Sequence, residues 1–131
     1  MGLAQKRALQ KLKEDVYPKH KAALDAAVGK DVEFAVHWDS YNEQDLSVIE
    51  NALEVYGLAQ IPRAFELVCK DDLGKGAVQE AVKKVELFSI AGSDDNALQF
   101  SDGVLKVGLG DPSYTGYWSS DRIAEFLEEK L

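Results

Sequence analysis

The chain has 131 residues, of which 46% are hydrophobic and 29% are charged, so we expect one globular domain and exclude a disordered chain. Its one cysteine, Cys69, excludes an intramolecular disulfide, and with only two histidines a Cys₂His₂ or Cys₄ zinc site is excluded as well. The net charge of −8 argues against nucleic acid as a partner, because binding to the phosphate backbone needs a basic face.

The N-terminal part of the chain predicts two helices. Residues 3–15 carry apolar side chains at helical spacing, which predicts the first. Pro18 suits the first position of a helix, so a second helix or a kinked continuation is expected over residues 18–28. Gly29 is the residue type that commonly follows a helix, and we expect the second helix to end there.

Charge is distributed unevenly between this helical part and the rest. Residues 1–30 hold seven Lys/Arg and three Asp/Glu, whereas residues 31–131 hold eight Lys/Arg and twenty Asp/Glu. We interpret residues 1–30 as a basic helical arm that packs on the acidic body of its own chain or of a second copy. An arm that binds an acidic partner is the alternative.

The clearest strand pattern lies over residues 31–39, where apolar side chains alternate with polar or small ones. Asn42, followed three residues later by Asp45, then predicts the N-terminus of a helix. Gly57 is expected to end this helix, and Pro62 is expected to prevent its continuation.

The second half of the chain predicts mostly strands. Asp102-Gly103, flanked by apolar runs, is the strongest short-range signal for a hairpin. The expected elements are strands over 64–70 and 85–91 with a short helix over 78–84 between them, a turn over 92–96, hairpin strands over 97–101 and 104–109, a loop over 110–118, and a final helix capped by Ser119 or Ser120.

This order of elements predicts an α+β fold over residues 1–131 as a single domain. We expect a mostly antiparallel sheet of four to five strands packed by helices, with an N-terminal helical pair and a C-terminal helix. No run of about 18 apolar residues occurs, so no membrane-spanning segment is expected. The N-terminus also lacks the apolar stretch of a secretory signal, and the expected location is the cytoplasm.

The first candidate site is the end of the strand over residues 31–39. His37 is suited to proton transfer near neutral pH, and Asp39 is a carboxylate on the same predicted face, which makes them weak catalytic candidates. Ser40 or Cys69 would be the nucleophile, although their spacing does not require this. The alternative is a half-exposed histidine at the edge of a sheet.

The second candidate site is aromatic. Aromatic side chains on a loop suit either a partner interface or the cover of an apolar pocket, and they also suit closing the core. The predicted ligand- or partner-binding residues are Trp38, Tyr41, Tyr114, Tyr117 and Trp118.

Three further motifs are interpreted as structural. Residues 73–76 place two glycines around a lysine, but they lack the first glycine and the final Ser or Thr of a P-loop, so we expect a turn. The acidic pairs at 71–72, 94–95 and 128–129 do not have the spacing of a calcium loop. Cys69 is expected to be a small buried apolar residue. No metal site and no cofactor is therefore predicted.

Two functional hypotheses follow from these features. The first, which we favour from the sequence, is a non-catalytic protein-interaction module whose acidic body recognises a basic protein partner. The second is a protein that binds a small apolar ligand in a pocket, and that could be a small enzyme using His37. A homodimer is compatible with both hypotheses, because the basic helices of one copy could meet the acidic body of another.

Overall fold

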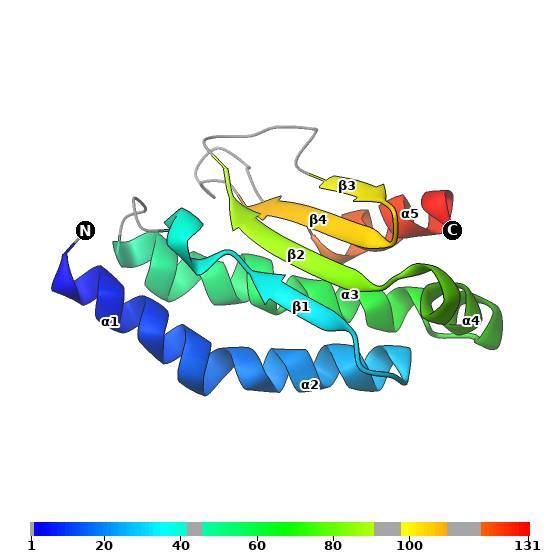
Figure 1. The fold of residues 1–131 in the computed structure, drawn as a ribbon, viewed down its shortest axis with the longest axis horizontal. Helices are drawn as coiled ribbons and strands as arrows, with labels where there is room; N and C mark the ends of the chain where they lie inside the picture. The colour runs from blue at the N-terminus through cyan, green and yellow to red at the C-terminus, as the bar shows by residue number, and fades with distance from the viewer. Residues whose placement is uncertain (1, 42–45, 91–97, 110–118) are drawn as a thin grey trace.

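The structure is a computed structural model that describes residues 2–41, 46–90, 98–109 and 119–131 (Figure 1). The helical elements are α1 (Leu3–Lys11), the π-helix η1 (Leu12–Val16), α2 (Tyr17–Val28), the 3₁₀-helix η2 (Trp38–Tyr41), the π-helix η3 (Val48–Leu58), α3 (Gln60–Val68), α4 (Asp72–Ala81) and α5 (Ser120–Lys130). The strands are β1 (Glu33–Val36), β2 (Lys84–Ser89), β3 (Leu98–Ser101) and β4 (Val104–Leu109).

The described strands form one four-stranded sheet in the order β1-β2-β4-β3. β1, β2 and β4 run parallel, and only β3 is antiparallel to its neighbour. The α+β class and the packing by helices are confirmed, but the expected mostly antiparallel sheet of four to five strands is wrong. The hairpin is present, with Asp102 and Gly103 both at positive φ. However, β4 inserts between β3 and β2, so the hairpin joins the sheet through a parallel pair.

The segment over residues 57–70 differs most from expectation. Gly57 does not end a helix but lies inside η3, and the predicted strand over 64–70 is largely the helix α3. Pro62 lies in the first turn of α3, where the backbone N–H groups of a helix have no partner within it, so a proline is tolerated. These helices, together with α4, connect β1 to β2, and a parallel pair requires such a crossover.

The predicted turn over residues 73–76 is also helical, because α4 begins at Asp72. Asp71 caps it by accepting a hydrogen bond from the Gly74 N–H at 2.7 Å. Other local signals are confirmed by the structure. Gly29 follows α2 in the left-handed region with a φ of 84°, and Ser119 caps α5. The N-cap predicted at Asn42 and Asp45, and the turn over 92–96, lie outside the described residues.

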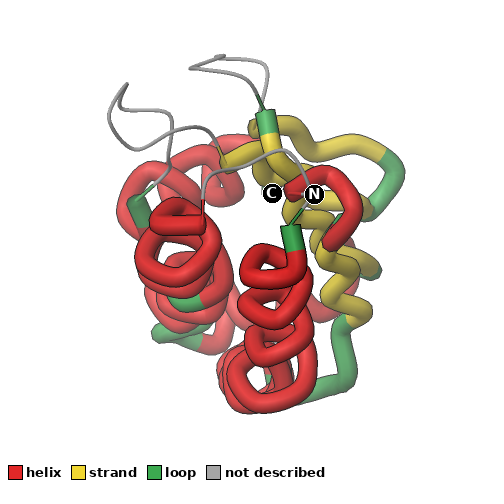
Figure 2. Tube along the Cα trace, turned by 90° about the vertical axis from the view of Figure 1, so that its left-hand side faces the viewer, coloured by secondary structure: helices red, strands yellow, loops and turns green. Residues whose placement is uncertain are grey.

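The helices cover one face of the sheet and the edge beside β1, and the described residues leave the other face open (Figures 1 and 2). The core lies between sheet and helices. Its fully buried side chains come from α2, η3, α3, α4, α5 and the inner positions of the strands, and include Leu53, Phe65, Leu87, Leu105 and Leu127. Sheets with parallel neighbours usually have both faces covered, whereas no described helix covers this face of β1, β2 and β4, which we call the open face.

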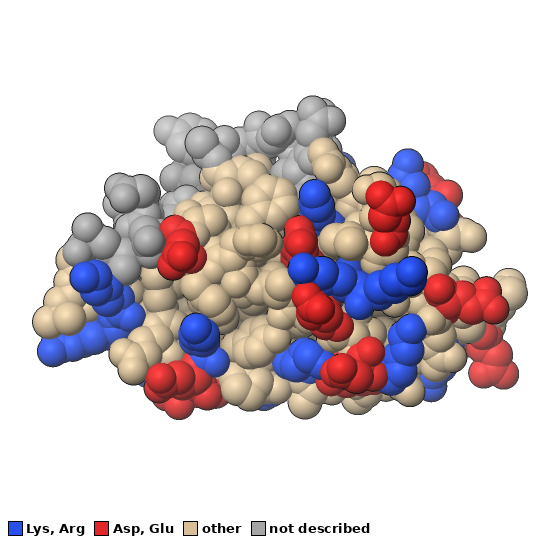
Figure 3. All heavy atoms as spheres, viewed as in Figure 1, with Lys and Arg blue, Asp and Glu red and all other residues tan. Residues whose placement is uncertain are grey.

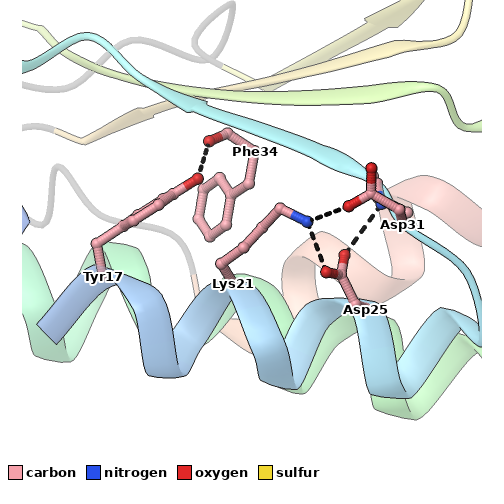
Figure 4. A network of polar contacts seen from close by, with 6 residues as sticks. Tyr17, Lys21, Asp25, Asp31 and Phe34 are labelled. Carbon is pink, nitrogen blue, oxygen red and sulfur yellow. Dashed lines mark hydrogen bonds and ion pairs between the residues drawn. The ribbon is translucent and has the colours of Figure 1, made fainter.

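The N-terminal helices close the outer edge of β1. The Tyr17 hydroxyl donates a hydrogen bond to the Phe34 carbonyl at 2.6 Å, and the Asp25 carboxylate accepts one from the Val32 N–H at 3.0 Å (Figure 4). Both backbone groups would otherwise be available to pair with another strand. The chain therefore protects this edge with its own helix.

Lys21 reinforces the junction between α2 and β1. Its ammonium lies 2.6 Å from a carboxylate oxygen of Asp25 and 2.6 Å from one of Asp31 (Figure 4). Burial disfavours the charge of Lys21, but the hydrogen bonds with the two carboxylates outweigh it and raise the pKa of the lysine. Lys21, one of the cations of the N-terminal helices, is thus paired with carboxylates of its own chain.

Candidate functional site

The open face of the sheet carries a row of charged side chains that point away from the core. The register places Glu33 beside Lys84, and Glu86 beside Lys106. The Lys84 ammonium lies 3.1 Å from a Glu33 oxygen and 3.2 Å from a Glu86 oxygen, and the hydrogen bond with Glu33, followed by that with Glu86, raises the pKa of the lysine. Figure 3 shows that charged side chains of both signs gather on this face, beside a largely uncharged area over the carboxyl ends of β1 and β2.

His37 stands where β1 ends. Its backbone N–H donates to the Leu87 carbonyl at 2.8 Å, which continues the pairing of β1 with β2 by one residue. Its ring Nε2 lies 3.7 Å from a Glu86 oxygen, longer than a hydrogen bond, and half of the side chain is exposed. The imidazole is therefore held near a carboxylate but keeps hydrogen-bonding capacity for a ligand.

Ser40 fixes the turn that follows His37. Its hydroxyl donates to the His37 carbonyl at 2.5 Å and accepts a hydrogen bond from the Ser89 N–H at 2.9 Å. These two bonds tie η2 to the carboxyl end of β2. Ser40 is thus a structural link in the described structure, and its hydroxyl does not hydrogen-bond the His37 ring.

Two adjoining hollows share His37 and Ser40. One, of about 350 Å³, lies over the sheet and is lined by His37, Ser40, Glu86, Phe88, Ser89 and Lys106. The other, of about 400 Å³, is lined by Lys13, Val36, His37, Trp38, Asp39 and Ser40. We call the two together the His37 groove. Volumes of this order are typical of small-molecule sites, which span about 300–1,000 Å³.

The floor of the His37 groove beside β4 combines an aromatic ring with a lysine that has no ion-pair partner among the described residues. Phe88 is half-buried and lines the hollow, and its register partner is Gly108, which adds no side chain on that face. Lys106 is exposed and forms no ion pair with any described residue. Glu86, in contrast, already contacts Lys84 and is mostly buried.

The structure brings some of the sequence-predicted site residues to this groove. His37, Trp38 and Asp39 line it, and the Trp38 ring packs edge-on against Tyr17 with 6.1 Å between ring centroids. Tyr41 does not line it, because that side chain is buried in the core. Tyr114, Tyr117 and Trp118 lie outside the described residues.

Sequence reasoning missed Glu86, Phe88 and Lys106. All three lie at outward positions of strands that the sequence predicted. Their alternation with apolar residues along each strand could have indicated that their side chains point away from the core. The order of the strands could not be predicted from the sequence. That order places Lys106 of β4 and Glu86 of β2 beside His37.

The buried Tyr41 hydroxyl has no hydrogen-bond partner among the described residues. Burial also raises the pKa of this phenol well above its ordinary value, so it stays neutral. Because an unsatisfied buried hydroxyl costs about 1–3 kcal/mol, we expect Tyr41→Phe to leave the free energy of unfolding unchanged or raise it by about 1 kcal/mol. Urea unfolding measures this, and a loss of stability on substitution would mean that the hydroxyl has a partner.

The other sequence motifs do not form a site in the described structure. Cys69 is a half-buried residue after α3, and burial raises the pKa of its thiol. No group of three or more potential ligands among the described His, Cys, Asp and Glu residues could hold a metal ion. Within the same described ranges, no helix has the length and apolar character needed to cross a bilayer.

No protein-family model, curated protein or solved structure matches this chain.

Proposed function

We propose that this protein binds a small molecule in the His37 groove and does not transform it. The observation that carries the proposal is the convergence of His37, Glu86, Phe88 and Lys106, from three parallel strands, on one hollow in an open sheet face. Ligands of open α/β sheets bind at the carboxyl ends of parallel strands, which is where His37 and Ser89 lie. Rigid strand ends position such groups better than loops do.

The unused groups of the groove indicate the class of ligand. The Lys106 ammonium offers N–H donors and no acceptor, so it favours a carboxylate, a phosphate or another acceptor. Phe88 offers an apolar face beside it. A small aromatic or apolar molecule that carries an acidic group satisfies both, and this refines the apolar ligand expected from the sequence.

Binding is proposed rather than catalysis because the polar groups that the structure describes around the groove are not arranged as a nucleophile and its base. The Ser40 hydroxyl is engaged by backbone groups, and Cys69 lies at the end of α3, in the helix layer. Nucleophilic catalysis needs the nucleophile within hydrogen-bond reach of its base. His37 and Lys106 are then binding residues.

Thermal melting tests the proposal with 3-phenylpropionate and phenyl phosphate as probes and neutral 3-phenylpropanamide as the comparison. At about 100 times the dissociation constant a ligand adds roughly 2.7 kcal/mol, which raises the melting temperature by several degrees. We expect an acidic probe to raise the melting temperature in this way. Lys106→Gln or His37→Gln should weaken the affinity for that probe by about tenfold or more. Lys83→Gln, an exposed lysine before β2 and outside the groove, is the matched control.

Equal melting temperatures with and without the acidic probes would contradict a ligand site at His37. That result would favour the interaction module instead, in which exposed acidic residues at the start and end of α4, such as Asp72 and Glu80, recognise a basic protein. Binding to such a partner would weaken with salt and with Asp72→Asn and Glu80→Gln combined.

A further inference from the structure

A third hollow, of about 530 Å³, separates the N-terminal helices from η3. It is lined by Ala4, Arg7, Ala8, Lys11, Leu12 and Val16 on one side and by Glu50 and Glu54 on the other. We call it the α1–η3 groove. None of its residues lines the His37 groove, and it lies among the helices rather than on the open face of the sheet.

The two walls of the α1–η3 groove carry opposite charges. Arg7 and Lys11 are four residues apart on α1, and Glu50 and Glu54 are four residues apart on η3. Like charges at this spacing repel each other within a helix. In the described structure neither cation forms an ion pair with these carboxylates across the groove, so the repulsion on each wall is not relieved by the other wall.

Glu54 is held ionised from outside the groove. The ring Nε2 of His20 lies 2.9 Å and the ammonium of Lys19 lies 3.2 Å from the same oxygen, Oε2 of Glu54. The hydrogen bond with His20, supported by Lys19, keeps the pKa of Glu54 below its ordinary value despite burial. Its other oxygen, Oε1, is not engaged by a described residue and remains available to a donor in the groove.

The wall formed by α1 and η1 also supplies apolar surface. Leu12 is buried, and Ala8 and Val16 are half-buried and pack on the core. A ligand there would thus contact an apolar surface between the two sets of charges.

Both π-helical segments of the described chain contribute to this groove. η1 supplies Leu12 and Val16, and η3 supplies Glu50 and Glu54. η1 is a single π-helical turn of five residues within the N-terminal helix, and such turns are rare and occur frequently at functional sites.

We propose that the α1–η3 groove binds a zwitterion with an apolar body, namely an amino acid or a short peptide. Its ammonium group lies against Glu50 and Glu54, and its carboxylate lies against Arg7 and Lys11. The apolar side chains rest on Ala8, Leu12 and Val16. The volume is in the range of small-molecule sites. The ligand brings an anion to Arg7 and Lys11, and it brings a cation to Glu50 and to the second oxygen of Glu54, whose first oxygen is paired with His20 and Lys19.

Isothermal titration calorimetry with three related peptides tests this assignment. Leucyl-leucine carries both charges, N-acetyl-leucyl-leucine lacks the cation, and leucyl-leucinamide lacks the anion. We expect leucyl-leucine to bind about tenfold tighter than either analogue, because each analogue loses one charged pairing. No heat of binding from any of the three, or equal affinity for all of them, would overturn the proposal.

Two substitutions test which wall of the groove binds the ammonium group of the ligand and which wall binds its carboxylate. Glu50→Gln should weaken leucyl-leucine and the amide but not the acetylated peptide, whereas Arg7→Gln should weaken leucyl-leucine and the acetylated peptide but not the amide. Lys6→Gln, exposed beside Arg7 and outside the groove, should change none of them, and His37→Gln should also have no effect. Loss of binding without this selectivity would overturn the zwitterion assignment. So would a dimer that Arg7→Gln dissociates, because a second copy would then fill the groove.

Discussion

Replacing Gly74 by alanine should destabilise the protein by about 3 kcal/mol or more, the largest effect expected from adding one methyl group to the described chain. A Cβ atom at this position would lie 1.9 Å from the carbonyl oxygen of Val68, which is backbone and cannot rotate away. The end of α3 or the first turn of α4 would have to move. Urea unfolding at neutral pH measures the change.

Gly76 provides a matched control two residues further along α4. A Cβ atom there would meet no heavy atom within 4 Å. Because alanine has the higher helix propensity, Gly76→Ala should raise the free energy of unfolding by about 0.5–1 kcal/mol. Equal effects of the two substitutions would show that the close approach of α3 and α4 at Gly74 is not as described.

Replacing Gly57 by valine should cost about 2–3 kcal/mol, because this residue lets η3 approach the sheet closely. Gly57 is buried, and a Cβ atom there would lie 3.2 Å from Leu87 Cδ2 and 3.3 Å from Leu109 Cδ2. The two methyl groups of valine would extend further into these leucines of β2 and β4. Thermal and urea unfolding both measure the loss.

Val55, two residues earlier in η3, supplies the comparison. Its side chain is 49% exposed, so Val55→Ala should change the free energy of unfolding by no more than about 0.5 kcal/mol. If Gly57→Val were as mild as Val55→Ala, then η3 would not pack on β2 and β4, and the assignment of Gly57 to a helix interior would be wrong.

Gly57, Pro62 and Gly74 explain why the middle of the chain was predicted poorly. Each is a residue type that usually interrupts a helix, and prediction from the local sequence therefore places a turn or a helix end there. In the structure, Gly57 and Gly74 are required by close contacts with residues distant in sequence or in another helix, and Pro62 occupies a helix start. Tertiary packing therefore overrides local propensity at these positions.

Three other predictions that depended on local chemistry are confirmed. Gly29 after α2, Ser119 before α5 and the turn at Asp102-Gly103 all act within a few residues of themselves. The parallel pairing of β2 with β4 depends instead on the whole arrangement of strands. For the same reason the sequence indicated His37, at the end of a recognisable strand, but not Lys106, which only strand order brings beside it.

The central proposal, that the open sheet face around His37 binds an acidic small molecule, is tested most directly by NMR. Backbone amide resonances would be followed while 3-phenylpropionate is titrated into the ¹⁵N-labelled protein. We expect Lys106→Gln to reduce the shifts, and we expect the largest shifts in the unsubstituted protein at the groove residues His37, Ser40, Phe88, Ser89 and Lys106. Shifts confined to the helices on the other face of the sheet, or no saturable shifts at all, would contradict it.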